Sequence, residues 1–137
     1  MKGYNKLVRD RIPEIIERSG QVCSAESLSG TVIYLHSAAE GFKTDCLRRK
    51  GRVCVSCVRN TCRVEEKYTT KYESAMIRGT ASEVTDDKEK IHALQLICAR
   101  HAPSNMENFD KAVKESLNRT AIWKIDISEI TGKANLL

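Results

Sequence analysis

The amino-acid sequence predicts a mainly β chain with inserted helices, an α+β protein whose antiparallel strands form a barrel or rolled sheet. Two observations favour this class. Runs of β-branched and aromatic residues, typical of strands, come before two helical segments that follow each other directly. The run 119–130 then alternates apolar and polar residues, as a strand of an antiparallel sheet does. A doubly wound sheet would instead alternate strands and helices along the chain.

The expected elements follow one another along 137 residues, the length of one ordinary domain. Apolar residues at near-helical spacing, with Pro13 in the first turn, predict a helix over 6–18. Residues 21–30 are small and polar and predict a connection. The further predicted elements are strands at 31–35, 52–58, 72–84 and 119–130, helices at 39–49, 86–101 and 105–117, and a segment 59–71 that begins irregular and becomes strand-like.

Some side chains have an expected place within these elements. In the helix predicted over 39–49, the side chains of Phe42, Cys46 and Leu47 are expected to point inward. Gly79 predicts a bulge or bend in a long strand. Trp123 lies on the apolar side of the alternating strand, where a core residue is the better interpretation than a stacking group for a ligand.

Composition limits the classes of partner. The net charge of +5 suits a phosphate-bearing ligand, but aromatic residues make up only 5%, fewer than a stacking platform for nucleic acid needs. No apolar stretch is long enough to cross a bilayer, and the charged first ten residues do not resemble a secretory signal. We therefore expect a cytoplasmic protein that binds neither nucleic acid nor membrane.

Six cysteines are expected to be free thiols in a reducing compartment. The spacing of Cys54, Cys57 and Cys62 suggests a metal site at first sight. However, the first two stand three residues apart in RVCVSCV, which predicts a strand, and such residues point to opposite faces. No histidine with zinc-finger spacing follows. We expect small buried hydrophobes and no metal.

The residues that could carry chemistry form one local group. The sequence contains no dinucleotide-binding glycine motif, phosphate-binding loop, HExxH or GxSxG motif. Instead, His36 and Ser37 end a strand, Gly41 allows a tight turn, and Lys43 and Arg48 lie on the following helix. Backbone N–H groups at a helix start, a serine hydroxyl and a lysine ammonium can together bind a phosphate.

Three segments of the sequence resemble one known family. They read IYLHSAAEGFKTDCLRR followed by RVCVSCV, then KYTTKYESAMIRGTASEVTDDKEK, then RTAIWKIDISEITGK, in order over residues 31–133. This pattern is similar to the pyridoxamine 5'-phosphate oxidase-like superfamily, and in particular to its nitroimidazole-resistance branch. The resemblance implies an antiparallel split β-barrel, usually a homodimer, with FMN bound in the groove between the subunits.

The resemblance also implies roles for single residues. Lys43 matches the basic residue that reaches the FMN phosphate, and Ser37 and Ala38 match the turn beside the cofactor. His36 matches a histidine near the flavin and its substrate, which makes it the candidate catalytic residue. Arg48 is a further candidate for cofactor binding. The alternative for His36 is a histidine at a strand end that only hydrogen-bonds its neighbours.

The chain departs from the family before residue 30, where the resemblance implies opening strands that have no evident counterpart. Residues 1–21 instead resemble the start of the all-α nucleotide pyrophosphohydrolases, although no acidic metal-binding helix follows. The expected organisation is an atypical helix and connection over 1–29 and a split-barrel flavin-binding domain over 30–137. An edge left open by absent strands favours pairing with a second chain, and hence a homodimer.

The resulting hypothesis is an FMN-binding oxidoreductase that acts on a small molecule, with nitro-aromatic compounds such as nitroimidazoles as the acceptors that the resemblance implies. A non-catalytic flavin- or ligand-binding split-barrel protein is the alternative. A nucleotide pyrophosphohydrolase is the third hypothesis, but the sequence does not contain the acidic metal-binding helix of that family.

Overall fold

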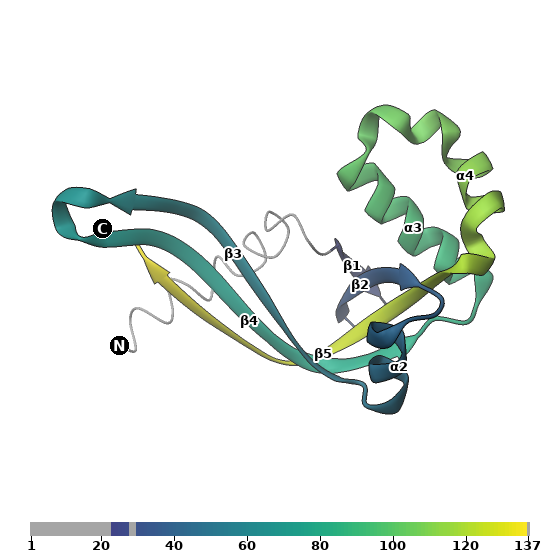
Figure 1. Cartoon of the computed structure of the whole chain (residues 1–137), viewed down its shortest axis with the longest axis horizontal. Coiled ribbons are helices and arrows are strands. Elements are labelled where there is room, and N and C mark those ends of the chain that lie inside the picture. The colour runs from purple at the N-terminus through teal and green to yellow at the C-terminus, as the bar shows by residue number, and fades with distance from the viewer. Residues whose placement is uncertain (1–22, 28–29, 137) are drawn as a thin grey trace.

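The computed structural model describes residues 23–27 and 30–136. The helix predicted over 6–18 lies outside the described residues. Within them, five strands form one antiparallel sheet in the order β1-β2-β5-β4-β3, with helices at one end (Figure 1). The strands are β1 (Cys23–Ser27), β2 (Gly30–Ala38), β3 (Arg52–Val64), β4 (Thr69–Glu83) and β5 (Thr120–Asn135). The α-helices are α2 (Phe42–Arg49), α3 (Asp87–His101) and α4 (Phe109–Ser116), and short 3-10 turns are η1 (Glu65–Lys67), η2 (Pro103–Asn108) and η3 (Leu117–Arg119).

The predicted class is confirmed, since the sheet is antiparallel throughout and the helices are inserted into it. The four predicted strands and the helices at 39–49 and 86–101 are all present. The helix predicted over 105–117 is divided, because Asn105 departs from helical backbone angles (φ −118°) and α4 begins only at Phe109. Within the described residues, no helix has both the length and the apolar character needed to cross a bilayer.

The connection predicted over 21–30 is wrong, because this segment contains β1. Its five residues pair antiparallel with β2, from Cys23 opposite Tyr34 to Ser27 opposite Gly30. The sequence CSAES carries no strong strand propensity. Pairing with the apolar strand beside it therefore decides its conformation, which is a tertiary effect that a scan of residue types misses.

The segment 59–71, predicted to begin irregular and become strand-like, belongs to β3 from its start, and its irregularity is a shift in register within the strand. β3 continues through it to Val64, with a shift in register between Arg59 and Cys62 where Asn60 adopts a positive φ of 53°. A tight turn at Glu65–Lys67 then leads into β4. The polar residues that suggested a loop lie along an edge strand, where one face and one backbone edge are open to solvent.

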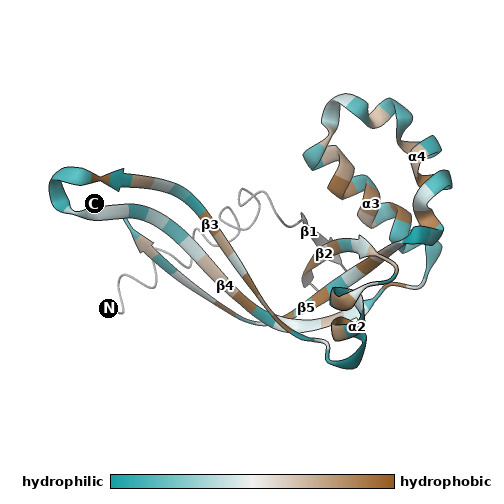
Figure 2. Ribbon diagram, in the orientation of Figure 1, coloured by the Kyte–Doolittle hydropathy of each residue, from teal (hydrophilic) through white to brown (hydrophobic). Residues whose placement is uncertain are grey.

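The distal parts of three strands form an arm that extends away from the helices (Figure 1). We define the arm as residues 56–64, 69–77 and 130–135. Polar and apolar residues are mixed along it, whereas hydrophobic stretches gather in the sheet near α2 (Figure 2). The arm contains a buried ion pair at 2.8 Å between Arg59 Nε and Glu73 Oε2, whose side chains are 8% and 3% exposed. This pair joins β3 to β4 next to the register shift.

One face of the sheet carries the first apolar cluster, around Ile33, Ile77, Trp123 and Ile125. Alternation along the strands places these side chains on the same face, and Leu47 of α2 packs against them. The prediction that Trp123 is a core residue is confirmed, because only 2% of it is exposed. The bulge predicted at Gly79 is also confirmed by a register shift between β4 and β5 at this residue.

The opposite face carries a second cluster beneath α3 and α4, which includes Tyr34, Leu94, Phe109, Val113 and Ile122. The alternation in 119–130 predicted a strand with one buried face. The start of β5 is instead buried on both faces, because the helices inserted between β4 and β5 fold back over it. Figure 1 shows α3 and α4 above this end of the sheet.

A polar contact at the start of α3 joins this helix to the sheet. The Asp86 side chain caps the helix by accepting from the Glu89 backbone N–H at 3.0 Å. The Tyr34 hydroxyl donates to Glu89 Oε1 at 2.9 Å, and Lys124 Nζ lies 3.8 Å from the same oxygen. Burial, and then the hydrogen bond to Glu89, raise the pKa of Tyr34 from 10.0 to about 12.

Replacing Tyr34 by Phe should remove this bond and lower the free energy of unfolding by about 1–2 kcal/mol near neutral pH. Folding raises the Tyr34 pKa, so its contribution is complete below pH 10 and is lost as pH rises from 10 towards 12. The difference between wild type and Tyr34→Phe in urea denaturation should therefore shrink over that window. Tyr68→Phe, at an exposed position, is the matched control. A difference that stays constant through pH 12 would contradict the assignment.

Candidate functional site

The candidate site lies where β2 ends and α2 begins. Gly41 is the N-cap residue of α2, and no side chain caps this helix. The first helical bond runs from the Asp45 N–H to the Gly41 carbonyl at 2.9 Å. The N–H groups of the residues between them precede the intrahelical ladder, and such groups attract anions. The turn therefore has the backbone donors that the sequence predicted.

Gly41 is essential to the shape of this turn. Its backbone angles, φ 145° and ψ 174°, lie in a region that residues with a Cβ rarely adopt. A Cβ added here would meet no atom within 4 Å, so any cost of substitution comes from the backbone and not from a clash. The glycine lets the chain reverse sharply from the strand into the helix.

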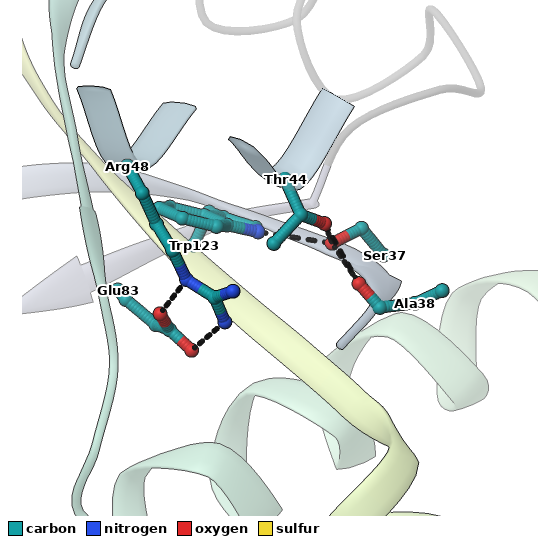
Figure 3. A network of polar contacts seen from close by, with 6 residues as sticks. All are labelled: Ser37, Ala38, Thr44, Arg48, Glu83 and Trp123. Carbon is teal, nitrogen blue, oxygen red and sulfur yellow. Dashed lines mark hydrogen bonds and ion pairs between the residues drawn. The ribbon is translucent and has the colours of Figure 1, made fainter. Parts of the chain in front are cut away.

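A chain of hydrogen bonds lies beneath the turn (Figure 3). Trp123 Nε1 donates to Ser37 Oγ at 3.0 Å, and Ser37 Oγ lies 3.3 Å from Thr44 Oγ1. The Thr44 hydroxyl donates to the Ala38 carbonyl oxygen at 2.8 Å. The Ser37 hydroxyl also lies 3.0 Å from that oxygen. Residues from β2, α2 and β5 thus meet at one point.

The neighbouring donors and acceptors limit which hydrogen bonds the Ser37 hydroxyl can make. The indole nitrogen of Trp123 can only donate, so Ser37 must accept from it. The single proton of Ser37 is then directed to Thr44 or to the Ala38 carbonyl. A phosphate oxygen needs a donor, so the serine hydroxyl could bind it only by leaving this chain. The contact of Ser37 and Ala38 with a cofactor stays a prediction.

Arg48 makes a two-point ion pair with Glu83, at the end of β4 (Figure 3). Its Nε and Nη2 atoms lie 2.9 Å and 3.2 Å from the two carboxylate oxygens. The hydrogen bond from Arg48 lowers the pKa of Glu83. The pair holds the last turn of α2 to the sheet, which gives Arg48 a structural role. Binding of a cofactor by Arg48 stays a prediction.

Lys43 and His36 are both exposed, but they lie on different elements. Within residues 23–27 and 30–136, Lys43 makes no ion pair, which leaves its ammonium group available to an anion. Strand alternation puts His36 on the face of β2 opposite Ser37. The structure therefore brings Ser37 to the base of the α2 turn, and no contact links His36 to Lys43. Their predicted roles stay predictions.

The expectation that Phe42 turns inward is wrong, since 83% of it is exposed. The helix begins at Phe42 and not at residue 39, so its buried side is formed by Thr44 and Leu47, three residues apart. Sequence reasoning missed both Thr44 and Glu83. Neither belongs to a recognisable motif, and only the meeting of β2, α2 and β5 shows what they contact.

The strand prediction for the first two cysteines of the cluster is confirmed. Cys54 is exposed and Cys57 is buried, on opposite faces of β3. In the part of the chain that the structure describes, no group of three or more His, Cys, Asp or Glu side chains could hold a metal ion. A shallow hollow of about 380 Å³ lies at the tip of the arm instead, lined by Arg63, Val64, Glu65, Tyr68, Thr69 and Thr70. It is formed by other elements than the β2–α2 turn.

Comparison with known proteins identifies the family. A family model described as pyridoxamine 5'-phosphate oxidase matches residues 22–134, and the chain therefore belongs to this family. The match begins next to β1 and ends within β5. Among curated proteins, none matches the sequence.

Several solved structures share the fold. A candidate 5-nitroimidazole antibiotic resistance protein from Bacteroides thetaiotaomicron superposes with a TM-score of 0.68 and 28% identity, over 90% of this chain and 82% of its own. A flavocytochrome from Azotobacter vinelandii gives a TM-score of 0.72 at 15% identity, over 98% of this chain and 69% of its own. An FAD- and heme-binding protein from Mycobacterium smegmatis gives 0.71 at 14%, over 94% and 72%. The antiparallel split-barrel prediction is thereby confirmed.

Replacing Gly41 by Ala should lower the free energy of unfolding by about 1–3 kcal/mol, because alanine must adopt backbone angles that suit only glycine. Urea denaturation followed by circular dichroism measures this loss. Glu40→Ala, at the exposed neighbouring position, should change stability by less than about 0.5 kcal/mol. A Gly41→Ala protein as stable as wild type would show that the turn tolerates other conformations.

Proposed function

We propose that the protein is an FMN-binding oxidoreductase of the pyridoxamine 5'-phosphate oxidase type that reduces nitro-aromatic compounds such as nitroimidazoles. Family membership over residues 22–134 carries this proposal, together with the anion-binding character of the turn at the start of α2. The most sequence-similar of the structures compared above is described in terms of nitroimidazole resistance, which supports the choice of substrate class.

The residues of the turn fit the phosphate end of the cofactor. The first turn of α2 has no side-chain cap, so its backbone N–H groups can point at an anion. Lys43 lies in this turn with its ammonium group exposed. Arg49, Lys50 and Arg52 lie at or beyond the other end of the helix. A phosphate at the first turn would therefore meet backbone hydrogen-bond donors and the charge of Lys43.

When bound, the flavin supplies electron or hydride transfer between a reduced donor, such as a nicotinamide, and the nitro group. The residues of this chain then have two tasks. Lys43 and the α2 amides orient the cofactor through its phosphate, and His36 gives or takes a proton near the substrate. The His36 side chain is exposed, so a substrate can reach its imidazole.

The alternative is a non-catalytic protein that binds a flavin or another ligand in the same place. The names of the similar structures include FAD as well as a flavocytochrome, so the choice of FMN also belongs to the proposal. Titrating the purified protein with FMN and with FAD separates these outcomes. A flavin absorbance band without turnover of a nitroimidazole would favour the non-catalytic alternative, and no band with either flavin would contradict the proposed function.

Replacing Lys43 by Ala should weaken FMN binding by about tenfold to a hundredfold, because one charge-assisted hydrogen bond of roughly 1.5–3 kcal/mol is lost. Flavin fluorescence during titration measures the affinity. Lys111→Ala, at an exposed position of α4, is the matched control and should leave the affinity unchanged. An unchanged affinity for Lys43→Ala would remove this residue from the site.

We also propose a homodimer in which FMN contacts both subunits. The outer backbone edge of β3 has no neighbouring strand within the described sheet, and open edges tend to pair or to be covered. Val58 and Met76 lie close together on one face of the arm and are 47% and 43% exposed. An apolar pair on an open face of a sheet favours contact with a second chain.

The protein should therefore sediment as a dimer at micromolar concentration, and Met76→Lys should shift it towards monomer by placing a charge in the contact. Arg78→Lys, on the same face but already charged, should leave the dimer intact. A monomer that binds FMN as tightly as a dimeric relative would show that the site lies within one chain.

A further inference from the structure

Thr44 is one of only two buried polar or charged residues among those that the structure describes, and the other is Glu73 in the arm. Only 2% of Thr44 is exposed, although it belongs to the first turn of a short surface helix. Burying a hydroxyl costs free energy unless it is hydrogen-bonded. Its short bond to the Ala38 carbonyl and its contact with Ser37 meet this requirement.

The hydrogen bonds around Thr44 have a single direction. Thr44 uses its only proton on the Ala38 carbonyl, so it can only accept from Ser37. Ser37 in turn accepts from Trp123, which is locked in the core. The chain therefore runs from the centre of the sheet to the end of β2, and the Thr44 hydroxyl cannot rotate away from the Ala38 carbonyl without losing its bond.

We infer that Thr44 is a positioning residue for the cofactor phosphate, acting through Lys43 and the backbone N–H groups of the α2 turn. Successive helical residues point about 100° apart, so an inward Thr44 fixes an outward Lys43 beside it. The inference rests on the proposed function, because the phosphate is the group that Lys43 is proposed to bind.

The other contacts of α2 act outside its first turn. The Arg48–Glu83 pair holds the last turn, but its side chains are 43% and 32% exposed, and exposed ion pairs are weakly stabilising. Leu47 packs on the core one turn later. The Ala39 N–H donates to the Arg119 carbonyl at 2.9 Å and holds the segment before the helix. The first turn itself depends on the Thr44 hydroxyl.

The test compares Thr44→Val, which keeps the shape of the side chain but removes the hydroxyl, with Thr44→Ser, which keeps the hydroxyl. Thr44→Val should weaken FMN binding on the order of threefold to tenfold, as expected for one hydrogen bond, and Thr44→Ser should restore most of this loss. Thr80→Val, the same change at an exposed position of β4 outside the arm, is the matched control. Equal affinities for wild type and Thr44→Val would overturn the inference.

A double variant separates positioning from a general loss of stability. Because Thr44 acts partly through Lys43, Lys43→Ala with Thr44→Val should lose less FMN affinity than the product of the two single losses. Multiplying effects in the double variant would overturn the inference. If Thr44→Val does not fold, Thr44→Ala removes the same hydroxyl and carries the same expectations.

A second readout does not depend on FMN. Trp123 is the only tryptophan, so its indole N–H gives a single signal in a nitrogen–proton correlation spectrum. Thr44→Val should shift this signal and speed hydrogen exchange of the Asp45 amide, which donates to the Gly41 carbonyl, whereas Thr44→Ser and Thr80→Val should not. If wild type binds no flavin, the proposed function fails, and unchanged indole and exchange signals in Thr44→Val would separately overturn the positioning role.

Discussion

The structure depends on the pairing of β5 with β2 on one side and β4 on the other. β5 comes last in the chain but lies in the middle of the sheet, so it joins strands that are far from it in sequence. It also separates the two apolar clusters, with Trp123 on one face and Ile122 on the other. Without this strand, β1 and β2 would have no connection to the hairpin of β3 and β4, and neither cluster could close.

The central position of β5 also organises the candidate site. The indole nitrogen of the buried Trp123 donates to Ser37, which in turn contacts Thr44 at the start of α2. Neutral hydroxyls therefore lie inside, while the Lys43 ammonium stays in solvent. This division follows from desolvation, because a buried hydroxyl is satisfied by one or two hydrogen bonds whereas a buried charge needs a matched partner. The β2–α2 turn is thus held by hydrogen-bonded hydroxyls on its buried side and carries the Lys43 charge on its exposed side.

Family membership and the structural comparisons agree with this arrangement at the level of fold. The similar structures include flavin-binding proteins, and their likeness at low sequence identity shows that the split barrel persists while most side chains change. In this chain the exposed large apolar side chains include Phe42 at the β2–α2 junction and Val58 and Met76 on the arm.

The sequence by itself determined the class of the fold, the strands with strong apolar patterns, the α3 helix, the bulge at Gly79 and the segment that forms the candidate site. These features depend on local propensity and periodicity, which can be read from neighbouring residues. Only the tertiary structure decided that 23–27 is a strand, that Phe42 points outward, and that Thr44 is buried against Ser37. The reason is that each of these results from contacts between segments distant in sequence, whose energies no local pattern contains.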